Sequence, residues 1–443
     1  MISLIFFLDF LSLIALTDTI KDMLSFFLLP ITLFAASLSV STSSSNICAI
    51  NGENGRVLYS KNMHQKIFPG SVTKLAVALY LIEECNIDKD LIITCNQEVL
   101  KVVSEKEKIA SKFTLPPYLL ENDGVTLYLS PGERITMESL LYALIVKSAN
   151  DAANVLASLY FDSIPDFMFK LNSYLRGIGC KNTHFLNPHG LHHPDHVTSP
   201  YDLALILQRA ISYPMLRKLI STAEYEIPKT NRSPSRIIKN SNGLIRPNSK
   251  HYLPYVIGGK TGYHREAKCN IASVGEKDGR LVIVVVNKAE NRLKLYEDCR
   301  KIFTAAFEEK KQSRVLFNKK DSSFSFVLPW AAKNLVAKLH EDCILEFYPS
   351  EEGEVVAEVN WHEFDRPISA DALVATLDVY NDEGDPIAQY ELFSDESIGY
   401  KLSYQVRLAI NAFIKLTASH PFLTFIGIVI IFLCIPKRRR KVV

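Results

Sequence analysis

Excess charge of one sign is nearly absent from this chain of 443 residues, whose formal net charge is +2. A run of five basic residues near the C-terminus, 437–441, more than accounts for it. Because nucleic-acid surfaces need clustered basic residues, the rest of the chain indicates no nucleic-acid partner. The run itself resembles a nuclear or RNA-binding tail, but that interpretation needs a cytosolic protein and conflicts with the N-terminus described below.

Paired cysteines are also missing, since none of the eight belongs to a CxxC pair. This excludes the common structural zinc motifs and the dense frameworks of small disulfide proteins. One cluster of imidazoles could suggest zinc instead: His189, His192, His193 and His196. Gly190 and Pro194 prevent a regular helix there, and no cysteine pair or carboxylate motif accompanies the cluster. We therefore predict a polar loop, no metal and no cofactor.

Both ends of the chain are apolar. Residues 1–45 contain one basic residue and a run, LSFFLLPITLFAASLSV, that is typical of a secretory signal, with Met23 just before it as the expected start. A buried N-terminal helix is the alternative. At 421–443 an apolar segment followed by basic residues predicts an inner-membrane anchor with a cytoplasmic tail, either spanning or lying in the interface, and hence a periplasmic body.

Two regions lie between these ends. Residues 46–310 begin with a hairpin in ICAINGENGRVLYSKN, continue through helices and close with three strands and a helix from Arg292. This order predicts an α+β domain, with an antiparallel sheet covered by helices and a helical lobe. Residues 311–402 read as a small all-β domain without a reactive constellation, and 403–420 as an amphipathic helix leading to the anchor.

A serine and a lysine stand three residues apart where a helix is predicted to begin. Pro69 and Gly70 end the preceding element, and the apolar residues of VTKLAVALYLIEE follow at helical spacing. Because positions i and i+3 share a helix face, the Ser71 hydroxyl and the Lys74 amine can approach hydrogen-bonding distance. A serine N-cap followed by an ordinary lysine would explain the same residues.

Two further motifs follow along the chain. KSAN supplies Ser148 and Asn150 between two predicted helices, and GGKTGYH supplies Lys260, Thr261 and Gly262 on a predicted strand. Alone, the first could cap a helix and the second could be a solvated strand end. The order SVTK, SAN, KTG, with each motif in the expected kind of element, indicates an active-serine acyltransferase.

With these motifs the chain resembles the penicillin-recognising serine enzymes, most closely the low-molecular-mass penicillin-binding proteins that act as D-alanyl-D-alanine carboxypeptidases. SANDAANVLA, FLNPHGL, TSPYDLA and ATLDVYNDEGDPIAQYEL also look like that family. The resemblance implies a β-lactamase/transpeptidase-like catalytic fold. The sequence departs from the family pattern at Gly70, Ala149 and Lys268 and in a longer stretch at 104–124, and no departure removes a reacting group.

Neutral serine is a weak nucleophile, so Ser71 needs a base in contact with it. Lys74 can serve only if desolvation or nearby positive charge, which Lys260 would supply, lowers its pKa. By resemblance, the hydroxyl then attacks the penultimate D-alanine, an acyl-enzyme forms, and Ser148 relays a proton to the leaving amine. Asn150 can hold the lysine and the substrate amide through its carboxamide.

The remaining site residues are expected to bind substrate. Thr261 and Lys260 can take the terminal carboxylate, and the resemblance adds Arg292 for the same role. Gly262 lets the substrate backbone approach the strand edge. By resemblance, the backbone N–H groups of Tyr263 and of the nucleophile form the oxyanion hole.

These residues predict a serine D-alanyl-D-alanine carboxypeptidase that trims peptidoglycan pentapeptide stems and is inhibited by penicillin, which acylates the same serine. A DD-endopeptidase that cuts crosslinks would use the same residues. A penicillin-binding scaffold with little turnover is a further alternative. A β-lactamase is disfavoured because a β-rich domain and an anchor follow the catalytic region.

Overall fold

The computed structural model describes residues 29–31, 37–381 and 384–419. The chain divides into two compact units, the larger comprising Ala35–Lys311 and Tyr348–Glu352. The smaller holds Gln312–Phe347 and the residues from Gly353 onward, together with the first residues of the chain. Most of the predicted signal region, including Met23, and the predicted anchor at 421–443 lie outside the described residues.

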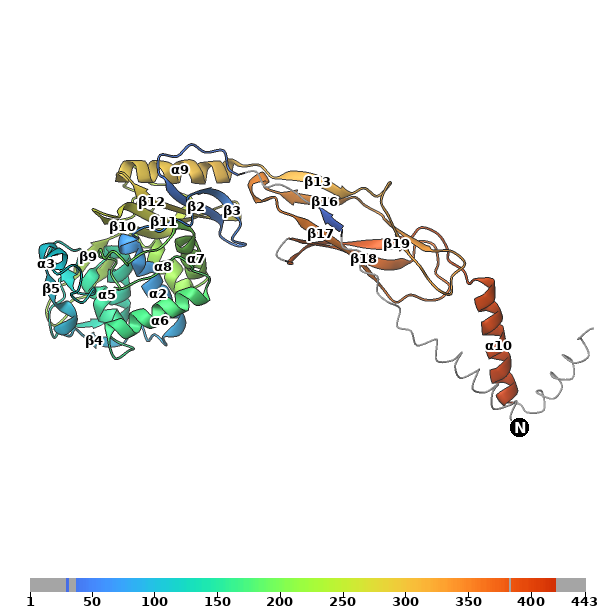
Figure 1. Cartoon of the computed structure of the whole chain (residues 1–443), viewed down its shortest axis with the longest axis horizontal. Helices are drawn as coiled ribbons and strands as arrows, with labels where there is room; N and C mark the ends of the chain where they lie inside the picture. Colours follow the sequence, from blue (N-terminus) through green and yellow to red (C-terminus); the bar gives the residue numbers. More distant parts are fainter. Residues whose placement is uncertain (1–28, 32–36, 382–383, 420–443) are drawn as a thin grey trace, which may run out of the picture. The chain divides into compact units, whose positions relative to one another are not determined.

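An antiparallel sheet of five strands forms the centre of the larger unit (Figure 1). The strand order is β10 (Val256–His264), β11 (Lys268–Lys277), β12 (Arg280–Ala289), β2 (Asn46–Asn51) and β3 (Val57–Lys61). The predicted hairpin at the start of the domain is β2–β3, and the predicted turn between β11 and β12 contains Asp278 and Gly279, both with positive φ. Such φ angles match the twist of a tight hairpin.

Alternate residues of the central strands belong to two separate cores. Ile47 and Ala49 of β2 pack in a core with residues of α9 (Arg292–Glu308), whereas Cys48 and Ile50 pack in a core with residues of α2 (Thr73–Glu84). The sheet is therefore buried on both faces, which explains why RLVIVVVN is an almost continuous apolar run instead of an alternating one.

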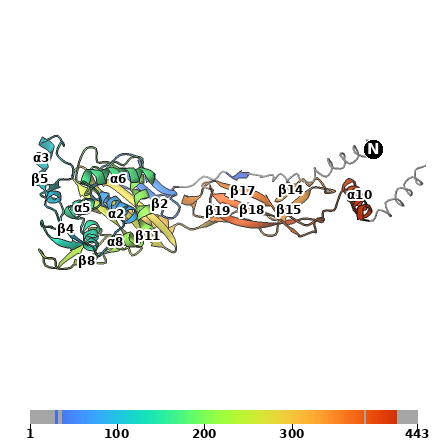
Figure 2. The ribbon, with the colours of Figure 1, turned by 90° about the horizontal axis from the view of Figure 1, so that it is seen from below.

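The face of the sheet that packs against α2 is covered by several helices, in agreement with the predicted helical lobe. Figure 2, seen from below, shows α2, α5, α6 and α8 on this side. Besides α2, the helices of this lobe are α3 (Glu105–Ala110), α4 (Met137–Tyr142), α5 (Asn150–Ala157), α6 (Ile164–Gly177), α7 (Pro200–Ile211) and α8 (Pro214–Ser221). The start of α7 is fixed by Ser199, whose side chain accepts a hydrogen bond from the Asp202 amide, and by Pro200 in the first turn.

Short paired strands complete the larger unit. They are β4 (Ile92–Thr94) with β7 (Arg134–Thr136), β5 (Val102–Val103) with β6 (Leu120–Glu121), and β8 (Glu224–Ile227) with β9 (Arg236–Lys239). The long stretch at 104–124 contains the helix α3. A capping box of Ser104 and Glu107 marks the start of this helix.

The smaller unit is built around a sheet of six strands and has its own apolar core. The strand order is β1 (Leu29–Ile31), β17 (Val355–Trp361), β18 (Leu373–Asn381), β19 (Pro386–Ser394), β15 (Leu335–Leu339) and β14 (Ser323–Phe326). A separate pair joins β13 (Gln312–Phe317) and β16 (Cys343–Phe347), and α10 (Leu402–Ser419) follows the sheet. The strand β1 falls within the predicted signal region. No helix in the described part of the chain is long and apolar enough to cross a membrane.

Candidate active site

The predicted serine and lysine are in contact at the start of α2. Ser71 lies in a 3-10 turn, Gly70–Val72, that runs directly into this helix. The Lys74 Nζ lies 3.0 Å from the Ser71 Oγ, 2.7 Å from the Asn150 Oδ1 and 2.5 Å from the backbone oxygen of His189. The lysine side chain is fully buried, whereas the serine remains partly exposed.

These three contacts fit a neutral amine. Burial lowers the pKa of Lys74 well below its usual value, and the positive charge of Lys260 lowers it further. A neutral amine has two N–H donors and one lone pair. The oxygens of Asn150 and His189 can only accept, so they take the two donors and leave the lone pair for the Ser71 proton.

The second serine contacts the second lysine. Ser148 has a left-handed backbone, with φ 66°, at the end of a π-helical turn, Ala143–Lys147, that continues α4. The Lys260 Nζ lies 2.9 Å from the Ser148 Oγ and 2.9 Å from the Thr261 backbone oxygen. Burial lowers the pKa of Lys260 to about 7. Lys260 is therefore partly protonated near neutral pH and can supply positive charge to the site.

The structure excludes the ordinary explanation of each motif. Neither α2 nor α5 has a side-chain N-cap, so Ser71 and Ser148 do not serve as caps. Lys260 retains 1% of its accessible surface, so KTG is not a solvated strand end. All five predicted catalytic residues instead join two hydrogen-bonded groups: Ser71, Lys74 and Asn150, and Ser148 with Lys260.

Glycines bring the KTG strand against the serine turn. A Cβ placed on Gly262 would lie 2.5 Å from the Pro69 oxygen and 2.9 Å from the Ser71 nitrogen. A Cβ on Gly70, whose φ is 56°, would lie 3.1 Å from the Tyr263 nitrogen. The backbone nitrogens assigned to the oxyanion hole therefore lie on two facing segments, and glycine at both positions allows this approach.

The predicted carboxylate-binding residues differ in their surroundings. The Thr261 Oγ1 lies 2.6 Å from the Ser241 Oγ, which makes Ser241 a polar neighbour that sequence reasoning missed. Arg292 is exposed at the start of α9. None of the hydrogen bonds or ion pairs among described residues joins it to Thr261 or Lys260, so its role remains a prediction.

The loop at 187–191 supplies the most important contact that sequence reasoning missed. The His189 carbonyl accepts a hydrogen bond from Lys74, and the Nε2 of the His189 ring lies 3.2 Å from the backbone oxygen of Tyr118. A Cβ on Gly190, with φ 85°, would lie 2.0 Å from the Gly70 oxygen. The phrase FLNPHGL, which we noted only as a family likeness, thus places the acceptor that helps orient the base.

The four clustered histidines do not converge on one point. Both ring nitrogens of His196 have hydrogen-bond partners. Its Nδ1 accepts from the Leu186 amide, and its Nε2 lies 2.9 Å from the Thr73 Oγ1. Burial lowers the pKa values of His189 and His196 well below the usual value, so both rings are neutral. These two histidines position the loop and the helix start.

Asp151 is another residue that the motif search passed over. Its carboxylate accepts hydrogen bonds from the amides of Leu127 and Leu129. The backbone N–H of Asn150 donates to the backbone oxygen of Val125, so the chain after the 104–124 stretch is hydrogen-bonded to the SAN motif. Burial raises the pKa of Asp151 despite these hydrogen bonds. The position of Asp151 directly after Asn150 was the sequence signal that could have identified it.

Comparison with known proteins agrees with this geometry. Residues 34–291 match the sequence family described as D-alanyl-D-alanine carboxypeptidase. The Bacillus subtilis protein of that name, DacF, is 29% identical over 260 residues, which are 59% of this chain and 61% of that protein. The Salmonella typhimurium protein DacD is 26% identical over 350 residues, which are 78% of this chain and 84% of that protein.

Solved structures confirm the predicted fold of the catalytic region. A Streptomyces DD-transpeptidase superposes with a TM-score of 0.52 at 25% identity, covering 60% of this chain and 98% of that one. The Francisella tularensis protein DacD superposes with a TM-score of 0.54 at 18% identity, covering 84% of this chain and 97% of that one. The second likeness concerns the fold alone.

Proposed function

Because the chain belongs to the D-alanyl-D-alanine carboxypeptidase family of serine hydrolases, we propose that it removes the terminal D-alanine from peptidoglycan pentapeptide stems through an acyl-enzyme on Ser71. One observation carries the assignment of the nucleophile. The buried Lys74 Nζ lies 3.0 Å from the Ser71 Oγ, and its two other contacts are oxygens that can only accept, so a neutral amine there has its lone pair left for the serine proton.

Acylation follows from this arrangement. Lys74 takes the Ser71 proton while the oxygen attacks the carbonyl of the penultimate D-alanine. Negative charge then develops on the carbonyl oxygen, and in this proposal the backbone N–H groups of Ser71 and Tyr263 bind it. Each such donor is typically worth about 3 kcal/mol in the transition state.

The leaving amine needs a proton as the peptide bond breaks. Ser148 can donate its hydroxyl proton and recover one from Lys260, whose ammonium lies 2.9 Å away. Since the pKa of Lys260 is about 7, a substantial fraction of it carries this proton near neutral pH. The charge of the same lysine, with Thr261 and Ser241 beside it, suits the terminal carboxylate of the peptide.

The cellular setting is also part of the proposal. The apolar N-terminus supports export, and α10 supports attachment to the inner membrane, with the catalytic unit in the periplasm. Several large apolar side chains of α10 are exposed: Leu402, Val406, Leu408, Ile410, Phe413 and Ile414. A helix of this kind can lie in the membrane interface.

The test uses the full chain in detergent micelles. It is incubated separately with a pentapeptide stem, a crosslinked stem dimer and a labelled penicillin. Free D-alanine from the pentapeptide is expected, and Ser71→Ala should lose both this activity and the penicillin label. Ser60→Ala, at an exposed position of β3, is the matched control.

Each other outcome assigns a different function. Cleavage of the dimer without release of terminal D-alanine would replace the carboxypeptidase with an endopeptidase. Labelling without either hydrolysis would leave a penicillin-binding scaffold. Labelling of the Ser71→Ala protein would show that another residue is the nucleophile.

A further inference from the structure

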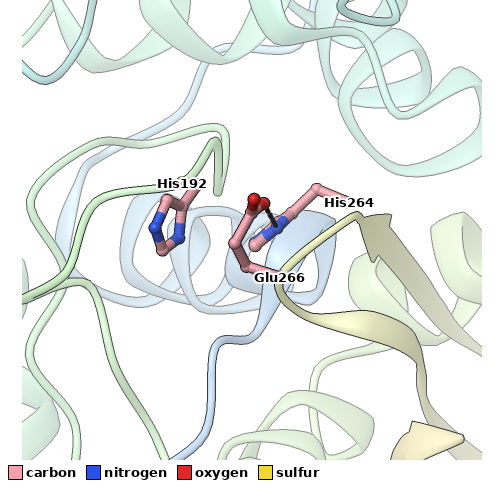
Figure 3. Close-up of side chains that lie close together, drawn as sticks. All are labelled: His192, His264 and Glu266. Carbon is pink, nitrogen blue, oxygen red and sulfur yellow. Dashed lines mark hydrogen bonds and ion pairs between the residues drawn. The ribbon is translucent and has the colours of Figure 1, made fainter. Parts of the chain in front are cut away.

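Three side chains outside the catalytic groups converge beside the active site (Figure 3). His192 comes from the histidine loop, His264 ends β10, and Glu266 lies in the turn between β10 and β11. One ligand atom from each lies within 4.8 Å of the other two. In the described part of the chain, this is the only group of three or more histidine, cysteine or acidic residues that meets this spacing.

Hydrogen bonds leave the two histidines of the group incompletely satisfied, whereas the Glu266 Oε1 also accepts from the Arg265 Nε at 3.2 Å. The His192 Nδ1 is buried and has no hydrogen-bond partner. The His264 Nδ1 lies 3.1 Å from the Ala267 amide nitrogen and 3.1 Å from the Glu266 Oε2. A neutral ring nitrogen that accepts from the amide has no hydrogen to offer the carboxylate, so it cannot satisfy both contacts. The buried His192 Nδ1, left without a hydrogen-bond partner, calls for one.

The donor set identifies the class of that partner. Two imidazoles and one carboxylate, with a fourth position open, are a ligand set that zinc takes. Tetrahedral ligands lie roughly 3.4 Å apart, so small side-chain rotations would close the group around an ion.

The location connects the group to the catalytic segments. The ring of Phe68, three residues before the nucleophile, lies with its centroid 4.7 Å from that of His192 and 6.3 Å from that of His264. His192 shares a loop with His189, the acceptor for the base, and His264 directly follows Tyr263. An ion here would join the loop that orients the base to the strand that carries an oxyanion-hole amide.

We propose that His192, His264 and Glu266 bind a divalent transition-metal ion of the zinc class, which clamps the histidine loop to the end of β10. The proposed role of the ion is to join these two segments at the rim of the active site; the acylation proposed above needs only Ser71, Lys74 and their partners. The donor set extends across two distant segments, which is why the histidine loop alone did not predict it.

Binding is measured by titration calorimetry on the full chain after chelator treatment, with zinc as the probe. One equivalent per chain is expected, and Glu266→Gln and His192→Ala should each weaken binding at least about tenfold. His193→Ala removes the neighbouring imidazole, which lies outside the group, and should bind zinc as the unaltered chain does. Cobalt in place of zinc should give the absorption spectrum of a four-coordinate ion.

A second readout tests the clamp. Zinc should raise the thermal midpoint of the unaltered chain and slow hydrogen exchange in 189–196 and 262–270, and Glu266→Gln should abolish both effects. Equal zinc affinity in Glu266→Gln, His192→Ala and His193→Ala would overturn the proposed site. Binding without slower exchange would overturn the clamp. Penicillin labelling of the same samples reports on Ser71 separately, so failure of the metal site leaves the proposed function standing.

Discussion

The two units bury different kinds of residue. The larger unit encloses two lysines, an aspartate and two histidines around its active site: Lys74, Lys260, Asp151, His189 and His196. In the described part of the smaller unit, Ser394 is the only buried polar residue. Buried ionisable groups cost stability unless they are partnered, so their concentration around one site makes that site a candidate for chemistry.

The largest expected effect is at the buried base. Lys74→Ala should slow penicillin acylation by about 10²–10⁴-fold, because Ser71 loses the group that takes its proton. The rate of covalent labelling measures this directly. Lys338→Ala, which removes a half-exposed lysine of the smaller unit, is the control and should label at the normal rate. Normal labelling of the Lys74 variant would refute the lysine as base.

The next effect concerns packing at the histidine loop. Gly190→Ala would force a Cβ to within 2.0 Å of the Gly70 oxygen on a backbone with φ 85°, so it should lower the free energy of unfolding of the larger unit by roughly 3 kcal/mol. Urea unfolding measures the change. Gly177→Ala has no atom within 4 Å of the new carbon and is the matched control. Equal midpoints would show that the loop yields easily.

An effect that is smaller at each pH step is expected in the pH dependence of stability. The pKa of Lys260 is about 7 in the folded chain and near 10.4 when unfolded, so between these values the unfolded state binds more protons. Stability from this group therefore rises with pH, by up to about 1.4 kcal/mol per pH unit. Unfolding of the unaltered chain and Lys260→Met between pH 7 and pH 10 should show the steeper rise in the former; parallel curves would contradict the lowered pKa.

The smallest effect on the active site should come from the other unit. Val359 of β17 is buried in the core of the smaller unit, and Val359→Ala should cost that unit about 2 kcal/mol by leaving a cavity. Because the two units have separate cores, penicillin labelling should be unchanged. A labelling rate that falls with this substitution would show that the contrast between the units is not a separation of tasks.

Much of this arrangement could be predicted from sequence because it is local. Hairpin turns, the serine–proline start of α7 and the i, i+3 spacing of Ser71 and Lys74 each depend on neighbouring residues. The ordinary alternatives to the motifs could not be excluded from sequence, since burial of Lys260 and the absence of side-chain caps are tertiary facts.

Contacts between distant segments were the part that sequence could not supply. The His189 carbonyl carries no side-chain signal, because every residue has the same backbone oxygen. The proposed zinc-class group was not considered from sequence because the histidine loop was judged alone, although His264 and Glu266 stand two residues apart directly after KTGY. Searching for partners of the loop at the end of that strand would have suggested the group.

The contact between Gly190 and the Gly70 carbonyl also has an evolutionary consequence. A side chain at position 190 fits only if the turn that carries the nucleophile moves. A displaced turn would then need different packing contacts from the histidine loop. We therefore expect substitutions at positions 190 and 70 to occur together. Insertions in the stretch at 104–124 should be confined to positions away from Tyr118, whose backbone oxygen lies 3.2 Å from the His189 ring of the same loop.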